Sequence, residues 1–239
     1  MIIGIEGTGS QEWDNYNLRR TFVRKVLEQS REQNKFYFIG PNNEGSDGDQ
    51  IIKGAWRQLH ILGMLDSKLI LVGYSRGAAY CMKLAEMWQK AWSGAKPIDV
   101  LVMFDAVARN KYSDSYVAGA YAWKKGWTEV DVPADVPDSV TTCLHATRNP
   151  MAGSRAGFGN VGLSVQDRRK TYMKIRQFMG SHGALGGTSF DAQSQEDVGS
   201  LDKKGKYPVA SDWLLNKVMP ADPRYAGGPV RLRSGDRLA

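Results

Sequence analysis

The chain has 239 residues and a formal net charge of +7, from 32 basic and 25 acidic side chains. Its hydrophobic share of 42% and charged share of 24% are ordinary for a globular protein and exclude a disordered chain. No apolar run approaches the roughly 20 residues of a transmembrane helix, and the first residues, MIIGIEGTGS, do not resemble a secretory signal. We therefore expect a cytoplasmic protein, with leaderless export as the alternative.

Short apolar runs alternate with segments of helical periodicity. The expected strands are 2–6, 36–39, 69–73, 100–104, 139–146 and 172–179, although the Lys and Arg content of the last also allows a helix. The expected helices are 15–33, 50–65, 76–92 and 213–218. This alternation predicts an α/β fold with a mostly parallel central sheet and helices on both faces.

Residues 1–219 are expected to form one domain, followed by a C-terminal tail at 220–239. An insertion at 107–138 contains the aromatic and basic stretch YSDSYVAGAYAWKKGW, residues 112–127. This stretch could be a helix packed on the core, or a lid that contacts a membrane surface. A lid would favour lipid esters as substrates.

The two cysteines, Cys81 and Cys143, are expected to be buried thiols, since two are too few for a disulfide scaffold. Nucleic-acid binding is supported only by the net charge of +7. Because the basic residues are scattered along the chain rather than clustered, we expect no nucleic-acid partner. No cluster of potential ligands has metal-site spacing, and neither a metal nor a cofactor is implied.

One motif suggests chemistry. The stretch 73–77, Gly-Tyr-Ser-Arg-Gly, fits G-x-S-x-G and lies between an apolar strand and a helix that begins with small residues. In a nucleophile elbow, the serine occupies a strained turn and the flanking glycines avoid steric conflict. Ser75 is therefore the predicted nucleophile, and a purely structural Gly-Ser turn is the alternative.

A serine hydroxyl needs a base, and the chain has three histidines. His182 lies in a glycine-rich loop after a candidate strand, where a base would be exposed at the sheet's edge, so we prefer it. His145, within a predicted strand, is the second choice. His60 lies within a predicted helix and is interpreted as a packed or surface residue.

The base in turn needs an acid to fix its tautomer. Asp105 ends the apolar strand VLVMF and is the preferred acid, with weaker candidates in a Pro-rich loop at Asp131, Asp135 and Asp138. The order Ser75, Asp105, His182 is the Ser…Asp…His order of α/β-hydrolases.

An oxyanion forms when the nucleophile attacks, and two backbone donors are expected to hold it. The first is the N–H of Arg76, the residue after the nucleophile. The second is expected from Thr8 and Gly9, in the glycine-containing turn after the first strand.

Several strings in collinear order resemble one family. They are Ile5-Glu6-Gly7-Thr8-Gly9-Ser10 (similar to F-D-G-T-x-N), Tyr37-Phe38-Ile39-Gly40-Pro41, Gly73-Tyr74-Ser75-Arg76-Gly77-Ala78 (G-F-S-R-G-A), Phe104-Asp105-Ala106-Val107 (F-D-T-V), His145-Ala146, Asp167-Arg168-Arg169, Gly180-Ser181-His182-Gly183-Ala184-Leu185-Gly186-Gly187 (G-x-H-S-D-V-G-G) and Ser211-Asp212-Trp213-Leu214-Leu215. The chain thus resembles the bacterial α/β-hydrolases that include the catalytic domains of type VI secretion phospholipase effectors.

This resemblance implies an α/β-hydrolase-like fold, the triad Ser75, Asp105 and His182, and a serine hydrolase acting on carboxylic esters, with lipid or phospholipid esters as the expected substrates. The chain departs from the family at Glu6 and at Ala184, where the family has aspartates, and it is short for the family. Because of these two departures, a non-catalytic binding or structural module is the alternative function.

Overall fold

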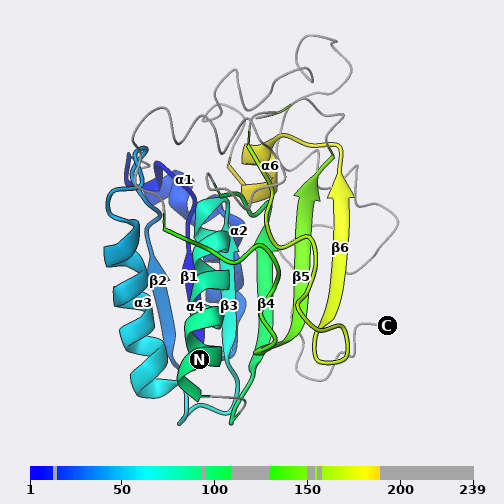
Figure 1. Cartoon of the computed structure of the whole chain (residues 1–239). Helices are drawn as coiled ribbons and strands as arrows, with labels where there is room; N and C mark the ends of the chain where they lie inside the picture. The colour runs from blue at the N-terminus through cyan, green and yellow to red at the C-terminus, as the bar shows by residue number, and fades with distance from the viewer. Residues whose placement is uncertain (13–14, 93–94, 109–129, 150–153, 155–157, 189–239) are drawn as a thin grey trace.

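The computed structural model describes residues 1–12, 15–92, 95–108, 130–149, 154 and 158–188 (Figure 1). Its strands are β1 Ile2–Ile5, β2 Lys35–Phe38, β3 Ile70–Tyr74, β4 Ile98–Phe104, β5 Val140–Arg148 and β6 Tyr172–Phe178. Its helices are the 3₁₀ turn η1 Ser10–Glu12 and the α-helices α1 Asn15–Arg20, α2 Phe22–Gln29, α3 Gly48–Leu62, α4 Arg76–Trp92 and α6 His182–Gly186.

The six strands form one parallel sheet in the order β2-β1-β3-β4-β5-β6. The register pairs Gly73 with Met103 across β3 and β4, and Met103 with His145 across β4 and β5. Strands β1 and β3 are buried along their whole length, which explains why their sequences are apolar throughout rather than alternating. The predicted parallel sheet is confirmed, and the segment predicted at 172–179 forms a strand, Tyr172–Phe178, rather than a helix.

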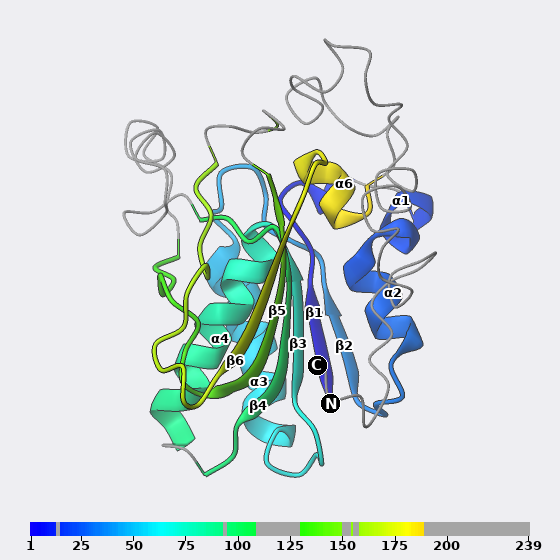
Figure 2. The same cartoon turned by 90° about the vertical axis from the view of Figure 1, so that its right-hand side faces the viewer.

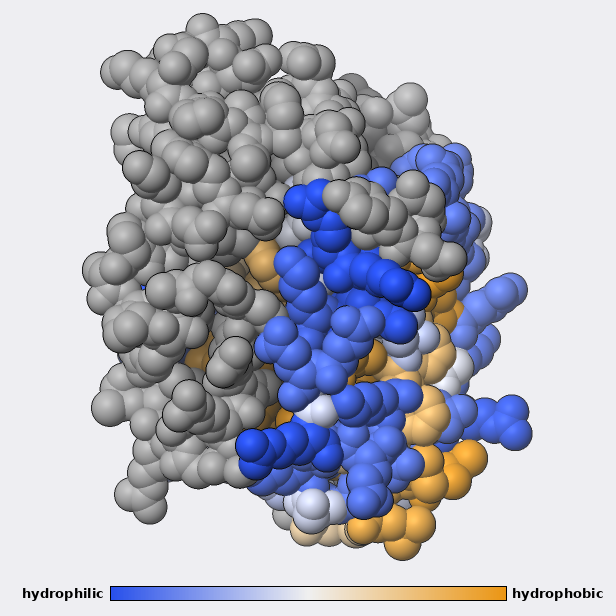
Figure 3. All heavy atoms as spheres, turned by 180° about the vertical axis from the view of Figure 1, so that it is seen from behind, coloured by the Kyte–Doolittle hydropathy of each residue, from blue (hydrophilic) through white to orange (hydrophobic). Residues whose placement is uncertain are grey.

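Helices cover both faces of the sheet, as Figure 2 shows: α3 and α4 lie on one side, and α1 and α2 on the other. The larger apolar cluster includes Ile52 of α3 and Trp88 of α4. The smaller cluster packs α2, through Phe22 and Val26, against β3 and β4. The outer surface of α2 is charged, and Figure 3 shows mostly hydrophilic side chains over the described part of that face.

The helix expected at 15–33 is in fact two helices, separated at Thr21. Thr21 has extended backbone geometry, and its hydroxyl accepts the N–H of Arg24, which caps α2. The same hydroxyl donates to the carboxyl group of Glu6 at the end of β1 (2.5 Å). A buried polar partner on the sheet therefore interrupts a helix that the apolar periodicity alone would continue.

Three expected segments lie outside the described residues: the aromatic stretch 112–127, the helix 213–218 and the tail 220–239. Cys81 and Cys143 are buried free thiols, as predicted. None of the described helices combines the length and the apolar composition that crossing a bilayer requires.

The position of a site follows from the strand order. The chain moves from β1 outward to β2, returns to β3 on the other side of β1, and continues to β6. Ligands of open parallel sheets bind beyond the carboxyl ends of the strands where this order reverses. Here that point lies between β1 and β3, so the turns that begin at Glu6 and at Ser75 adjoin it.

Candidate active site

Ser75 lies in a strained turn between β3 and α4. Its φ is 56°, a left-handed conformation that is rare for residues other than glycine. A Cβ on Gly73 would lie 2.5 Å from the Cα of Ala78, and one on Gly77 would lie 2.3 Å from the carbonyl oxygens of Ile5 and Glu6. Both glycines of the motif therefore allow close backbone contact, which is the role that the elbow pattern predicts.

The structure brings His182 to Ser75, although 107 positions separate them in the sequence. The imidazole Nε2 lies 2.9 Å from Ser75 Oγ. His182 is the first residue of the short helix α6, rather than part of a loop, and Ser181 caps that helix by accepting the N–H of Ala184. The backbone N–H of His182 donates to Ser154 Oγ (2.8 Å).

Tyr74 connects the serine turn to the helix that carries His182. Its hydroxyl donates to the carbonyl oxygen of His182 (3.1 Å), and the two rings lie 5.0 Å apart between centroids. Glycines adjoin the tyrosine ring: a Cβ on Gly7 would lie 2.6 Å from it, and one on Gly186 would lie 2.4 Å from it. The backbone after β1 and the backbone of α6 thus both pack directly on one aromatic ring.

Asp105 follows β4 and completes the arrangement. Its Oδ2 lies 2.7 Å from His182 Nδ1 and 2.5 Å from Arg148 Nη1. Its Oδ1 accepts the backbone N–H of Arg148 (3.1 Å) and the side-chain amide of Asn160 (2.9 Å). Burial alone would raise the pKa of Asp105, but these hydrogen bonds and the charges of His182 and Arg148 hold it well below its usual range.

The protonation of this cluster follows from the charge on Asp105. An ionised carboxylate only accepts hydrogen bonds. Nδ1 of His182 therefore carries a proton and donates a hydrogen bond to Asp105. In the neutral imidazole, Nε2 then has the free lone pair and accepts from the hydroxyl of Ser75. This arrangement can remove a proton from Ser75 and return it later in a reaction.

The other candidates from the sequence lie in different surroundings. His145 in β5 accepts the N–H of Ala106 at Nε2 and donates from Nδ1 to Gly162 O (3.0 Å), and burial lowers its pKa to about 4. Both of its nitrogens are therefore engaged. The ring of His60 in α3 makes tilted contacts with the rings of Trp56 and Trp92, with centroids 5.4 and 5.5 Å apart.

The alternative acids are also separate from His182. Asp135 accepts a hydrogen bond from Ser164, and Asp138 pairs with Lys170 (3.1 Å). Asp131 is exposed. Among the aspartates named from the sequence, the structure brings Asp105 to the imidazole.

The predicted oxyanion donors, the backbone N–H groups of Arg76, Thr8 and Gly9, differ in their surroundings. Arg76 is the first residue of α4, so its N–H lies at the positive end of the helix dipole, next to Ser75. The N–H of Gly9 is engaged, because it donates to Pro41 O (2.9 Å), which argues against Gly9 as a donor. Within the described residues, the N–H of Thr8 has no such partner, and its neighbour Gly7 packs against the side chain of Ser75. The N–H of Thr8 therefore remains the predicted second donor.

Glu6 is a buried carboxyl group next to this turn. Its Oε1 accepts from the hydroxyls of Thr21 (2.5 Å) and Tyr37 (3.0 Å), whereas Oε2 has no hydrogen-bond partner among the described residues. Burial raises the pKa of Glu6 to about 7, and the two hydroxyls only partly oppose this shift. An aspartate would be one methylene shorter, so the longer side chain of Glu6 suits contact with Thr21 across the face of the sheet.

A glutamine at position 6 is expected to make the protein more stable at alkaline pH. Between the unfolded value of 4.5 and about 7, the folded chain retains a proton that the unfolded chain loses, so wild-type stability falls as pH rises through this window. The total loss is about 3 kcal/mol at pH 8. Glu6→Gln removes this loss, because its amide does not titrate.

Urea unfolding at pH 5 and pH 8 measures the effect, as the difference in unfolding free energy between variant and wild type. The matched control is Glu28→Gln, which changes an exposed glutamate paired with Arg24. A Glu6→Gln advantage that is equal at both pH values would contradict the buried, protonated state of Glu6.

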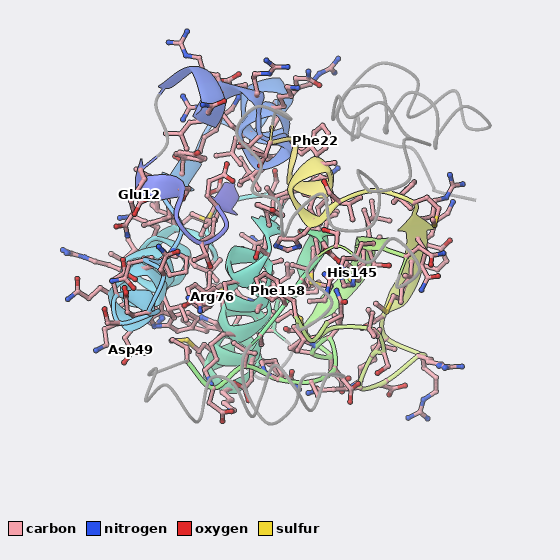
Figure 4. The ribbon with its side chains drawn as sticks, turned by 90° about the horizontal axis from the view of Figure 1, so that it is seen from above. Glu12, Phe22, Asp49, Arg76, His145 and Phe158 are labelled. Carbon is pink, nitrogen blue, oxygen red and sulfur yellow. The ribbon has the colours of Figure 1, made fainter. Side chains whose placement is uncertain are left out.

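Sequence reasoning missed several residues of the site. Arg148 and Asn160 hold Asp105, and Ser154 holds the backbone of His182. Figure 4 looks onto the carboxyl ends of the strands, where the labelled Arg76, His145 and Phe158 lie near the centre. One signal was available for Arg148: it is a charged residue that directly ends the buried strand TCLHATR.

No family model matches this sequence, and no curated protein matches it either. Solved structures do match. They include the RedJ thioesterase of prodiginine biosynthesis in Streptomyces coelicolor (12% identity, 77% of this chain and 80% of that one, TM-score 0.37). Others are the SrfTE thioesterase domain of surfactin cyclisation (12%, 87% and 93%, 0.40) and a hydrolase of the α/β superfamily from Xanthomonas campestris, named as putative (12%, 74% and 86%, 0.33).

At such low identities and TM-scores, these likenesses say nothing about the substrate of this chain. The assignment of the fold rests on the molecule itself. A parallel sheet with helices on both faces carries a strained serine turn after β3, an aspartate after β4 and a histidine after β6. The chain therefore has an α/β-hydrolase-like fold.

Proposed function

We propose that the protein is a serine hydrolase that cleaves carboxylic esters through an acyl-enzyme. The observation that carries the proposal is the continuous hydrogen-bonded path from Ser75 Oγ through His182 to Asp105, with contacts of 2.9 and 2.7 Å. Each contact is within the reach that proton transfer requires. The strained backbone at Ser75 and Asp105, with φ of 56° and 46°, also accords with a functional site.

In this mechanism, Ser75 Oγ attacks the ester carbonyl carbon while Nε2 of His182 takes the hydroxyl proton. The N–H groups of Arg76 and Thr8 stabilise the resulting oxyanion, and each such donor is typically worth about 3 kcal/mol in the transition state. The imidazolium then gives its proton to the departing alcohol, which leaves an acyl group on Ser75. Water, deprotonated by His182, hydrolyses this acyl-enzyme and restores the serine.

For the substrate, we propose lipid esters, with phospholipids as the leading class. The support is the sequence resemblance to bacterial α/β-hydrolases that include phospholipase effectors, together with the aromatic and basic stretch at 112–127. Such a composition suits contact with an anionic membrane surface. Substitution of the family's aspartates by Glu6 and Ala184 leaves the three reacting side chains in place.

Covalent labelling tests the nucleophile directly. A fluorophosphonate should react at Ser75, with the serine oxygen displacing fluoride from phosphorus, and peptide mass mapping should place the adduct on Ser75. The label should be absent from Ser75→Ala and retained in Ser164→Ala, which changes a serine that contacts Asp135. A folded wild-type protein that resists labelling would instead support a non-catalytic binding module.

The substrate class needs a separate panel. Short and long p-nitrophenyl esters, triglycerides and phospholipid vesicles are compared on wild type and Ser75→Ala. Hydrolysis of vesicle phospholipids that Ser75→Ala lacks supports the lipid assignment. Turnover restricted to short soluble esters would refute the lipid assignment while retaining the serine hydrolase.

A further inference from the structure

Arg148 is buried at the end of β5 and contacts two parts of the site. Its Nη1 donates to Asp105 Oδ2 (2.5 Å), and its Nη2 donates to the carbonyl oxygen of Phe158 (2.6 Å). Its own backbone N–H donates to Asp105 Oδ1 (3.1 Å). The side chain is only 6% exposed and the carboxylate is fully buried, so water screens their interaction weakly.

The same carboxylate oxygen serves two donors that can both be cations. Asp105 Oδ2 accepts from Arg148 Nη1 and from His182 Nδ1 (2.7 Å). When His182 takes the serine proton, a second positive charge therefore appears next to an arginine that is always charged. A positive charge at such short range typically lowers the pKa of a basic group by one or more units.

The other groups that face Asp105 are neutral. His145 in β5 is held uncharged by burial, with Nε2 accepting from Ala106 and Nδ1 donating to Gly162. The amide of Asn160 donates to Asp105 Oδ1 without contributing charge. Among the described neighbours of Asp105, Arg148 and His182 are thus the cationic groups that set its electrostatics.

Arg148 also contacts the segment beside the base, through Phe158. Phe158, whose carbonyl accepts from Arg148, places its ring edge-on to the imidazole of His182, with centroids 5.3 Å apart and an interplanar angle of 85°. Asn160, two residues later, donates to Asp105 and to Ala106 O. A single guanidinium therefore holds both the acid and the segment that packs on the base.

From these contacts, we propose that Arg148 is a positioning residue that orients Asp105 and, by partly neutralising this carboxylate, weakens its attraction for an imidazolium at His182. The arginine partly neutralises Asp105, so the imidazole gains a proton less readily than it would beside an isolated carboxylate. The catalytic meaning of this arrangement rests on the proposed function, but the protonation of His182 does not.

Histidine NMR tests the proposal without substrate. The chain has only three histidines, so ¹⁵N-histidine labelling gives few signals, and His60→Gln and His145→Gln assign them. In Arg148→Gln, the protonation midpoint of His182 should rise by about one pH unit, because the cation beside Asp105 is gone. Arg148→Lys keeps the charge and should stay much nearer to wild type.

The matched control is Arg169→Gln, which removes the same charge from a side chain that is 89% exposed and paired with Asp167. It should leave the midpoint unchanged. If Arg148→Gln fails to fold, Arg148→Met supplies the neutral variant with a long aliphatic side chain. Unchanged midpoints in folded neutral variants, or an equal rise in Arg148→Lys, would overturn the proposal.

Kinetics separates this inference from the proposed function. With an ester that wild type hydrolyses, the acid limb of kcat/KM should move to higher pH by about the same unit in Arg148→Gln. An inactive wild type whose His182 midpoint still responds to Arg148 would refute the hydrolase and retain the electrostatic role. An active wild type with no response would refute the role of Arg148 alone.

Discussion

Asp105→Asn is expected to lower kcat for ester hydrolysis by about 10⁴-fold, the scale typical of replacing a triad aspartate. The amide carries no negative charge, so the imidazolium formed when Ser75 is deprotonated loses its stabilising partner. If the amide nitrogen faces His182 Nδ1, the imidazole must also shift its proton to Nε2. It then cannot accept the proton of Ser75.

The controls for this variant are Asp135→Asn and Asp138→Asn, because both aspartates are alternative acids by sequence but contact Ser164 and Lys170 instead. Both should retain kcat within a few-fold of wild type. Rates are measured with the best ester of the panel, and circular dichroism verifies folding. A larger loss in Asp138→Asn than in Asp105→Asn would mean that the acid is misassigned.

Gly77→Ala is expected to destabilise the protein by more than about 4 kcal/mol or to prevent folding, an effect at the extreme of single substitutions. The added methyl would lie 2.3 Å from the carbonyl oxygens of both Ile5 and Glu6. These are backbone atoms of the last residue of β1 and of the residue after it, so relief requires α4 to move away from the sheet. Such a shift would also displace the turn at Ser75.

Gly54→Ala in α3 is the matched control, since it adds the same methyl to another helix. Its nearest neighbour is the ring of Phe38 at 3.2 Å, a half-buried side chain that can shift. Alanine also favours a helix interior by about 1 kcal/mol over glycine, so the net change should be small. Thermal and urea unfolding of both variants give the comparison, and a Gly77→Ala protein as stable as wild type would contradict the packing of α4 on β1.

The elements were predictable because parallel strands and their connecting helices have strong, separate sequence patterns. The run LILVG is typical of a strand buried on both faces, and the small residues after Ser75 indicated close packing of α4. Ser75, Asp105 and His182 could be chosen because each follows a predicted strand and because they occur in the chain order of α/β-hydrolases. In the structure, His182 lies within hydrogen-bonding distance of both Ser75 (2.9 Å) and Asp105 (2.7 Å).

What could not be predicted depends on contacts across the sheet. The break at Thr21 arises from Glu6, which no local pattern connects to it. Arg148 stands out in the sequence as a charged residue that ends a strand, but its contact with Asp105 depends on the pairing of β5 with β4. The engagement of the Gly9 N–H by Pro41 likewise depends on how the loop after β2 folds over the turn after β1.

The packing of Gly7 and Gly186 on the ring of Tyr74 has an evolutionary consequence. A side chain at either glycine would collide with the ring, and a smaller residue at position 74 would leave a void and remove the hydroxyl that donates to His182 O. Tolerated changes at the three positions must therefore compensate one another. Across homologous chains, positions 7, 74 and 186 should covary, although 67 and 112 positions separate them along the sequence.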